Sequence, residues 1–366
     1  VKIGVRGETM IIGCVKEIKK YEFRVGLTPN AASEYLRYGH QVWIEKGAGI
    51  GSGFKDSDYE AMGCILKDNA KEVWQKSDMI IKVKEPLESE YALFKENLIL
   101  YTYLHLASNE PLYRALKEKK VISIAYETMS YQNQLPCLEP MSMVAGRLSV
   151  LEAAKYSEAF FGGSGILMSG LPGTPRAKVT IIGAGIVGQN ACRMAVGLEA
   201  DITVLDLDTK RLAFLEDLYH NKIKTLYSNQ ENLRKSIIES DVVIGAVLIP
   251  GDAAPKLIKD EYLDQMKPGS IIVDVAIDQG GISNYSKVTY HDDPIYKVKD
   301  VLFYGVANMP GSVPKTSSIA LNNATLRYGL EMANKGIDEA LLNPVINSGL
   351  QTRDGIGIYP TLIKLF

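Results

Sequence analysis

The chain has 366 residues, of which 46% are apolar and 23% are charged, and its formal net charge at pH 7 is −2. This balance gives no support to a nucleic-acid-binding protein or to a protein that adheres to an acidic membrane surface. No apolar run reaches the ~18 residues that a membrane-spanning helix needs. The length allows two domains, each with its own core.

The cysteines and the first residues bear on the cellular compartment. Cys14, Cys64, Cys137 and Cys192 lie far apart, without a C-x-x-C pair. We therefore expect reduced thiols in a cytoplasmic protein rather than a secreted disulfide framework, and we find no signal-peptide pattern. Val1–Thr9 precede an apparent natural start at Met10 and are expected to be an N-terminal extension or a cloning remnant.

From Met10 onward, apolar runs of strand length alternate with helical patterns. A helix is expected from Thr28, as N-cap, to Gly39, with further helices near Ala70–Lys76 and Pro111–Lys119. The expected strands are Met10–Val15, Gln41–Glu45, Met79–Lys84, Leu98–Leu104 and Val121–Tyr126. Such alternation is typical of a mostly parallel sheet that helices cover on both faces.

The same alternation returns after a long helix expected over Ser142–Phe161. The expected strands are Val179–Gly183, Asp201–Asp206, Lys224–Tyr227, Asp241–Val247, Ser270–Val275 and Val301–Val306, followed by a helix over Thr316–Asn334. The sequence therefore predicts an α/β protein with two doubly wound, Rossmann-like domains, a cleft between them and long linking helices. We expect a substrate domain over 10–138 and 316–366, and a dinucleotide-binding domain over 139–315.

The most informative motif opens the second of these domains. A buried strand leads into Gly183-Ala-Gly185-Ile-Val-Gly188, a helix opens at Ile186, and the next strand ends in Asp206. In this context the glycines allow a tight turn and the close approach of a pyrophosphate, while the carboxylate can accept from a ribose hydroxyl. A glycine-rich turn without a ligand is the alternative, but packing alone poorly explains three glycines at this spacing.

Polar residues also follow the expected strands where these strands end. They are Arg24, in a loop after the first strand, and Lys84, His105, Glu127, Asp278 and Asn308. Each has an ordinary structural explanation, such as a packed histidine or an aspartate that caps a turn. Together they favour a site in which two cations bind a carboxylate. His105 would exchange a proton near neutral pH and Asp278 would orient it, beside a nicotinamide.

Several longer runs resemble bacterial alanine dehydrogenase, within the family that includes the alpha subunit of proton-translocating transhydrogenase. The matching runs are Glu22–Pro29, Lys82–Pro86, Leu104–Leu106, Ser123–Thr128, Pro140–Arg147, Gly183–Gly188, Ile244–Gly251, Asp274–Gly281 and Val306–Thr316. The resemblance implies an NAD-dependent enzyme of the cytoplasm that assembles as a homohexamer. Its substrates would be L-alanine, pyruvate and ammonia.

The resemblance also implies roles for individual residues. Arg24 and Lys84 would contact the substrate carboxylate and carbonyl, and His105 and Asp278 would be the acid–base residues. Lys287 stands where some members have an arginine that contacts NAD. The implied NAD site comprises Ser142, Gly183, Gly185, Ile186, Val187, Gly188, Asp206, Arg211, Ser228, Val247, Leu248, Val275, Ala276, Ile277, Asp278, Lys287, Val306, Ala307, Asn308 and Met309.

Some members of this family hold Mg²⁺ with a glutamate and a histidine one helical turn apart. Glu331 matches the glutamate, but Lys335 stands at the histidine position. A lysine cannot replace that ligand at neutral pH, so we expect no metal.

Two other functions remain open from the sequence. One is the cofactor-binding module of a membrane transhydrogenase, which would not need the substrate-type set of Arg24, Lys84 and His105. The other is an opine-type or lysine-type dehydrogenase with a larger substrate. The sequence does not distinguish these substrates, because the walls of the pocket cannot be read from it.

Overall fold

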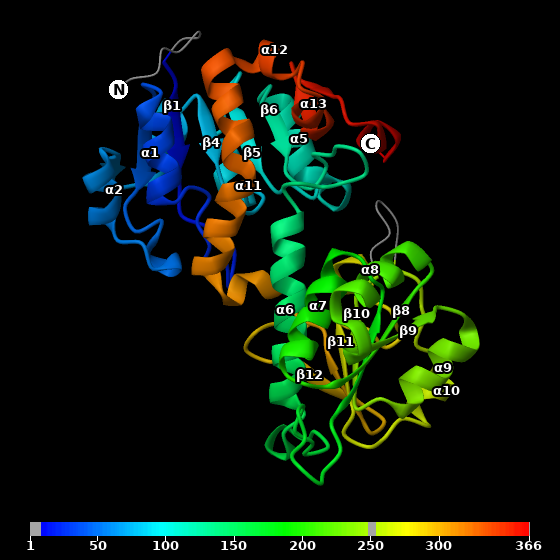
Figure 1. Ribbon diagram of the computed structural model, residues 1–366. Helices are drawn as coiled ribbons and strands as arrows, with labels where there is room; N and C mark the ends of the chain where they lie inside the picture. Colours follow the sequence, from blue (N-terminus) through cyan, green and yellow to red (C-terminus); the bar gives the residue numbers. More distant parts are fainter. Residues whose placement is uncertain (1–8, 248–253, 366) are drawn as a thin grey trace. The chain divides into compact units, whose positions relative to one another are not determined.

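The computed structural model describes residues 9–247 and 254–365, which form two compact units. One unit runs up to Met141 and resumes at Gly311, and the other comprises Ser142–Pro310 (Figure 1). The expected N-terminal extension lies, up to residue 8, outside the described residues. No helix in the described part of the chain is long and apolar enough to cross a membrane.

The first unit is built on one sheet with the strand order β15-β14-β6-β5-β4-β1-β2-β3. Its strands are β1 (Ile11–Cys14), β2 (Gln41–Glu45), β3 (Ile65–Lys67), β4 (Met79–Ile81), β5 (Ile99–Thr102), β6 (Ile122–Ala125), β14 (Leu350–Arg353) and β15 (Ile356–Gly357). From β3 to β6 all neighbours are parallel. The order reverses between β1 and β4, so the crevice at their carboxyl ends is where such a sheet binds ligands.

Helices cover this sheet. They are α1 (Pro29–Arg37), α2 (Asp56–Met62), α3 (Ala70–Lys76), α4 (Glu88–Tyr91), α5 (Glu110–Glu118), α11 (Pro314–Lys335), α12 (Ile337–Ala340), α13 (Pro344–Gly349) and α14 (Pro360–Leu365), with 3-10 turns η1 (Ile50–Ser52) and η2 (Leu106–Ser108). As expected, Thr28 caps α1, and its side chain accepts from the backbone N–H of Ala31. Helix α11 lies in front of β4 and β5 in Figure 1, where the Tyr101 hydroxyl donates to the Thr325 carbonyl at 3.1 Å.

The second unit has the strand order β12-β13-β11-β10-β7-β8-β9. Its strands are β7 (Lys178–Ile182), β8 (Asp201–Asp206), β9 (Ile223–Tyr227), β10 (Val242–Gly245), β11 (Ile271–Asp274), β12 (Ile295–Val298) and β13 (Val301–Tyr304). Only the β12–β13 pair within this sheet of described residues is antiparallel. The parallel strands follow the 3-2-1-4-5-6 order of dinucleotide-binding sheets, with the reversal between β7 and β10.

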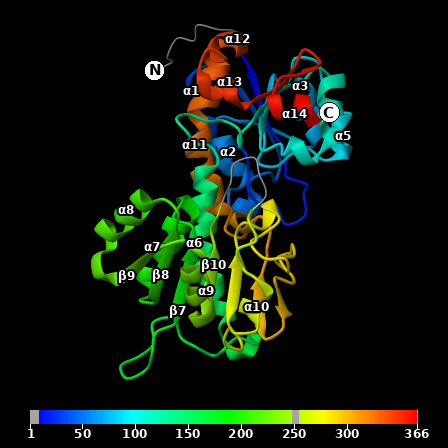
Figure 2. The same ribbon diagram turned by 90° about the vertical axis from the view of Figure 1, so that its right-hand side faces the viewer.

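The helices of the second unit lie on both sides of its sheet. They are α6 (Glu139–Tyr156), which begins in the first unit, α7 (Ile186–Gly197), α8 (Thr209–Tyr219), α9 (Gln230–Glu239) and α10 (Asp260–Leu263). The 3-10 turns are η3 (Ala159–Phe161), η4 (His220–Lys222), η5 (Ile277–Gln279) and η6 (Met309–Ser312). Figure 2 shows α7 and α8 on one side of β7 and β8. Helix α9 crosses back from β9 to β10, as a right-handed connection requires.

The long helix expected over Ser142–Phe161 differs from the structure at both ends. Helix α6 starts earlier, at Glu139, and stops at Tyr156. At its end the Ser157 hydroxyl donates to the Ala153 carbonyl at 2.8 Å, a side-chain bond that competes with the helix pattern. A Cβ at Gly163 would lie 2.3 Å from the Tyr156 carbonyl oxygen, so the chain folds back too closely for any other residue.

The C-terminal run, in which no strand was expected, completes the first sheet. Strand β14 pairs antiparallel with β6, and β15 pairs with β14. Leu362 of α14 is only 1% exposed and belongs to the apolar cluster that includes Phe94 and Leu98. The last strands are therefore part of the fold that supports β5 and β6.

Candidate functional site

The exits of β1 and β4 are tied together by Glu17. This glutamate follows β1, and its carboxylate accepts from the backbone N–H of Val83 at 2.7 Å and of Lys84 at 3.4 Å. Strand β4 ends at Ile81, three residues earlier than expected. The Lys82 N–H still donates to the Tyr101 carbonyl of β5 at 3.2 Å, whereas the next two N–H groups bond to the Glu17 side chain. The segment that carries Lys84 is therefore anchored where the strand order reverses, between β1 and β4.

A second lysine, Lys82, anchors the same stretch from inside the protein. Its side chain is fully buried, and its ammonium lies 3.3 Å from a Glu17 oxygen and 3.2 Å from a Glu90 oxygen. Desolvation acts to lower the pKa of Lys82, but the two carboxylates outweigh it and hold that pKa above its usual range. The other oxygen of Glu90 accepts from the Leu87 N–H at 2.9 Å, so residues 82–87 are fixed at both ends.

Lys84 has the environment of an anion-binding group. Desolvation, and next the nearby Arg24 charge, lower its pKa below the usual value for lysine. Within residues 9–247 and 254–365, its ammonium makes no hydrogen bond or ion pair, although its backbone carbonyl accepts from the Thr102 hydroxyl at 3.1 Å. A cation that is partly desolvated beside another cation gains free energy from an anionic ligand.

Arg24 is buried and fixed by Glu22. Its Nε donates to one Glu22 oxygen at 2.7 Å and its Nη2 to the other at 2.5 Å, while Nη1 lies 3.1 Å from the Met141 sulfur. The bidentate pair holds the plane of the guanidinium. The loop after β1 therefore presents Arg24 as a rigid cation, although the sequence indicated only a loop residue.

His105 stands at the exit of β5 in a strained backbone conformation. Its φ of 49° and ψ of 40° lie in the left-handed region, which is rare for a residue with a side chain. The Glu127 carboxylate accepts from the N–H of His105 at 2.6 Å and from the N–H of Leu104 at 3.1 Å. The His105 ring is exposed and parallel to the ring of Tyr103, with 6.1 Å between centroids.

The electrostatics show that these groups of the first unit are gathered. Desolvation acts to raise the pKa of the Glu85 carboxyl, but Lys19, Lys84 and His105 together lower it below its usual range. Tyr103, which feels the charge of Arg24, donates through its hydroxyl to the Cys137 carbonyl at 2.7 Å. Arg24, Lys84 and His105 therefore lie at one edge of the first sheet, and their roles in substrate binding and catalysis stay a prediction.

The glycine turn of the second unit leaves room for a phosphate. Gly183 has a φ of 103°, and a Cβ there would lie 2.6 Å from the Ala246 carbonyl oxygen at the end of β10. A Cβ at Gly188 would lie 1.8 Å from the Gly183 carbonyl oxygen, so this glycine serves the packing of helix against strand. A Cβ at Gly185 would meet only the Arg211 Nη1, at 3.8 Å. The N-cap of α7 has no side-chain bond, which leaves its first N–H groups to an anion.

Asp206 is held against this turn. One of its carboxylate oxygens accepts from the Ala184 N–H, and the other accepts from the Asp208 N–H at 2.8 Å. Arg211 lies 4.0 Å from Asp206 and 3.5 Å from Asp208. The carboxylate is thus fixed at the end of β8, where an adenosine ribose binds in this type of fold.

The remaining residues of the expected NAD site lie on the second unit. Ile186 and Val187 open α7. Ser142 lies on α6, one helical turn before Gly146, which packs against the Val187 carbonyl. The Ser228 N–H donates to the Asp206 carbonyl at 3.0 Å.

Lys287, another expected NAD-site residue, is exposed, with its ammonium 5.9 Å from the centre of the Tyr296 ring. The others occupy the ends of β10, β11 and β13 or the residues that follow: Val247, Val275, Ala276, Ile277, Asp278, Val306, Ala307, Asn308 and Met309. Leu248 lies outside the described residues.

Asp278, the second expected acid–base residue, is exposed in η5 after β11. It belongs to the second unit, whereas His105 belongs to the first. Their action as a pair therefore stays a prediction.

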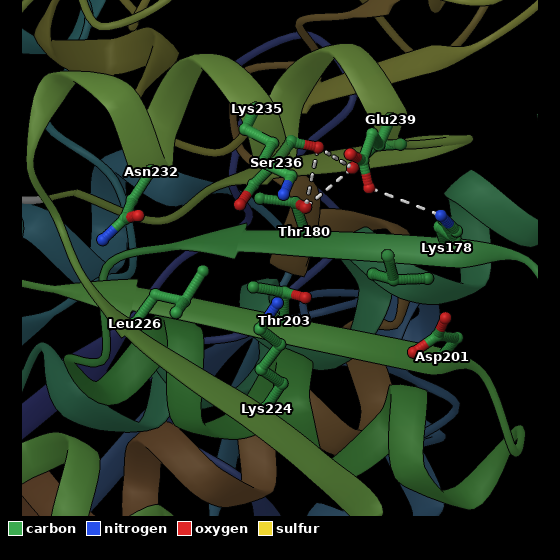
Figure 3. Close-up of a pocket in the computed structure, with 12 residues that line it drawn as sticks. Lys178, Thr180, Asp201, Thr203, Lys224, Leu226, Asn232, Lys235, Ser236 and Glu239 are labelled. Carbon is green, nitrogen blue, oxygen red and sulfur yellow. Dashed lines mark hydrogen bonds and ion pairs between the residues drawn. The ribbon is translucent and has the colours of Figure 1, made fainter.

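A pocket of the second unit lies apart from the glycine turn (Figure 3). It is bounded by α9 and by one face of β7, β8 and β9. The Ser240 hydroxyl oxygen lies 2.6 Å from both the Thr180 hydroxyl and the Ser236 carbonyl oxygen, and Lys178 pairs with Glu239 at 3.4 Å. None of the expected cofactor residues among those described lines this pocket. We therefore assign no function to it.

The described residues contain no group of three or more His, Cys, Asp or Glu side chains that could hold a metal ion. Glu331, which the family resemblance compares with a magnesium ligand, bonds to Lys335 at 2.9 Å and to the Asn343 amide at 2.8 Å. An ammonium thus takes the place where a second ligand would be needed, and this donor set does not fit a metal.

Sequence reasoning missed the residues that hold the functional groups in place. Glu17, Glu22 and Glu90 carry no recognisable spacing. A buried glutamate beside a strand exit becomes visible only when the strand order is known. Glu127 was noticed as a strand-end residue, but its bonds to the backbone of His105 could not be predicted.

The strand order of the second unit and its glycine turn define a dinucleotide-binding protein of the Rossmann type. The comparisons with known proteins are more specific. The family descriptions "Alanine dehydrogenase/PNT, N-terminal domain" and "Alanine dehydrogenase/PNT, C-terminal domain" match residues 13–145 and 149–360. The chain therefore belongs to the alanine dehydrogenase/PNT family.

Individual relatives agree with this assignment. The chain is 51% identical over 357 residues to alanine dehydrogenase of Bacillus subtilis (strain 168), which covers 97% of this chain and 94% of that one. A solved L-alanine dehydrogenase structure is 44% identical and superposes with a TM-score of 0.95 over 98% of this chain and 99% of that one. A transhydrogenase from Sinorhizobium meliloti has a TM-score of 0.82 at 24% identity, over 96% and 99% of the two chains, which shows the shared fold alone.

The three glycines of the turn predict different effects of alanine. Gly188→Ala should lower the free energy of unfolding by about 1–3 kcal/mol or more, because its methyl group collides with the Gly183 carbonyl. Gly185→Ala should keep the fold but weaken NADH binding about tenfold or more, because its methyl group occupies the approach of the pyrophosphate. Gly197→Ala, where nothing lies within 4 Å, is the control. Equal effects of the first two changes on thermal stability would contradict this division.

Lys84→Met should separate stability from binding. The lowered pKa means that the fold binds the Lys84 proton less tightly than the unfolded chain does. The charged ammonium therefore destabilises the fold at neutral pH, and this cost fades only as pH rises from the lowered pKa toward the usual ~10.4. Lys84→Met should raise the melting temperature at pH 7 and raise the KM for pyruvate about tenfold or more. The exposed Lys71→Met is the control. A lower melting temperature together with an unchanged KM would contradict both roles.

Proposed function

We propose that this protein is an NAD-dependent L-alanine dehydrogenase, which oxidatively deaminates L-alanine to pyruvate and ammonia and catalyses the reverse reaction. Its relatives over nearly the whole chain carry this name. The observation that carries the proposal within the structure is the environment of Lys84, a desolvated cation beside Arg24 and near His105. Such a set suits a small anionic substrate with a reacting carbon next to its carboxylate.

Arg24 and Lys84 divide the recognition of the substrate. Arg24, fixed by Glu22, offers a cation of set orientation to the carboxylate. Lys84 supplies a compact charge that can also donate to the carbonyl oxygen of pyruvate. Binding the substrate anion would relieve the repulsion between these two cations, which adds to its affinity.

The second unit fits NAD. The space at Gly185 and the uncapped start of α7 suit the pyrophosphate, and Asp206 suits the ribose hydroxyls and would repel a 2′-phosphate. We therefore expect NAD rather than NADP. When bound, NAD accepts the hydride from the Cα of L-alanine. The end of β11 and the residues after β13 would hold the nicotinamide beside the substrate.

His105 and Asp278 would handle protons. Oxidation of the Cα–N bond leaves an iminium carbon, to which water must add before ammonia can leave. An exposed imidazole can take the proton of that water and return a proton to the departing nitrogen. Asp278 would assist from the second unit, so both units would have to contribute to one reaction.

Two alternatives are weaker. A transhydrogenase module would have no use for the paired cations of Arg24 and Lys84, and the likeness to the solved transhydrogenase extends to the fold alone. A dehydrogenase for a larger amino acid remains distinguishable by assay. The proposal extends to a cytoplasmic enzyme, because all four cysteines are buried thiols, and to a homohexamer, as the family resemblance implies.

The direct test is NADH formation with L-alanine, L-serine, glycine and L-lysine in parallel, and with NADP in place of NAD. We expect the highest kcat/KM with L-alanine and NAD. His105→Ala and Asp278→Asn should each lower kcat by about 10²-fold or more, as for a lost general acid–base group, while NADH binding survives. The double variant should be little slower than the slower single variant, because groups that act as a unit are not additive.

Each part of this proposal can fail separately. If L-lysine were turned over faster than L-alanine, L-lysine rather than L-alanine would be the substrate. An equal kcat/KM with NADP and with NAD would show that Asp206 does not select NAD. A His105→Ala enzyme with near-normal turnover at neutral pH would show that the exposed His105 ring takes no part in the proton steps.

A further inference from the structure

The turn that directly follows Asp278 has an unusual backbone. Gly280 and Gly281 have φ values of 88° and 74°, so two successive residues adopt left-handed conformations. A Cβ at Gly281 would lie 2.3 Å from the Ser286 Cβ and 2.4 Å from an Asp274 oxygen. Glycine loses more conformational freedom on folding than any other residue. Other groups must therefore stabilise this turn.

Lys256 holds this turn from its carbonyl side. Its ammonium donates to the carbonyl oxygens of Gly280 at 2.5 Å, Gly281 at 2.9 Å and Ser283 at 3.1 Å. A lysine ammonium has three donors, and in this turn each meets one backbone acceptor. Bonds from a charged donor are stronger than those between neutral groups, so one side chain fixes three carbonyl groups that would otherwise repel one another.

Asp274 holds the same turn from its donor side. Its carboxylate accepts from the Ile282 N–H at 2.9 Å and from the Ser286 hydroxyl. The chain around Lys256 also lies along the turn, since the Ala254 N–H donates to the Gln279 carbonyl at 2.9 Å and the Ile258 N–H to the Ile282 carbonyl at 3.0 Å. The turn is therefore fixed by a cation on one side and an anion on the other.

We propose that Lys256 is a positioning residue of the reaction: by binding the carbonyl groups after Asp278, it holds Asp278 in the orientation that proton transfer requires. This inference rests on the proposed function, in which Asp278 assists the proton steps. Lys256 itself has no free donor for a substrate, because its three donors are taken by the turn. Its effect on catalysis should therefore pass through Asp278.

The test uses the whole protein and begins without substrates. Hydrogen exchange should be faster at the amides of Gly280, Gly281 and Ile282 in Lys256→Met than in the wild type. Lys256→Arg, which also donates to carbonyl groups, should restore most of the protection. Lys259→Met removes an exposed lysine three residues away and should leave the exchange unchanged. Unchanged exchange in Lys256→Met would overturn the proposal whatever the protein catalyses.

Kinetics then separate positioning from general damage. Lys256→Met should lower kcat about tenfold or more and leave the dissociation constant of NADH nearly unchanged, with recovery in Lys256→Arg. In the Asp278→Asn background, Lys256→Met should have little further effect, because both changes remove one function. An equal loss in both backgrounds, or a parallel loss of NADH binding, would overturn the proposal. A wild type that does not oxidise L-alanine would instead refute the proposed function, while the exchange experiment would still decide whether Lys256 holds the turn.

Discussion

The arrangement of both sites depends on one constraint: the backbone N–H groups at the exits of parallel strands must find acceptors. Where a strand ends, the ladder no longer supplies them. In this protein, side-chain carboxylates supply the missing acceptors. Glu17 accepts from the exit of β4, Glu127 from that of β5, and Asp206 from the glycine turn after β7, while Asp274 accepts from the turn that follows Asp278. Each carboxylate therefore fixes the segment that carries a functional residue.

The same constraint explains a cost in stability. Strand exits that are held by buried carboxylates bring charges into the interior, and these charges need cations such as Lys82 and the guanidinium of Arg24. Desolvation, and next the nearby charge of Arg24, lower the pKa of Lys84. Desolvated charges of this kind favour ligand binding at the expense of the unliganded fold. The first unit is thus preorganised for an anion before any ligand arrives.

Most of the fold could be predicted from the sequence, because its helices and strands follow from short local sequence patterns. The glycine fingerprint, the capped helix after Thr28 and the alternation of apolar runs sufficed for two doubly wound sheets. Strand β14 could not be predicted, because its pairing with β6 joins segments that lie far apart along the chain. Arg24, Lys84 and His105 were found as strand-end residues, yet their supports were missed. The hydrogen bonds of Glu17 and Glu127 depend on which strands are neighbours in the sheet, and residue spacing in the sequence does not reveal the strand order.

The most direct test of this dependence on carboxylates is the turnover of Glu127→Ala. If the carboxylate holds the left-handed backbone of His105, its removal should lower kcat about tenfold or more without changing the dissociation constant of NADH. The exposed Glu118→Ala is the matched control and should match the wild type. A Glu127→Ala enzyme with normal turnover would show that His105 keeps its place unaided. Carboxylates at strand exits would then not be what places the functional groups of this protein.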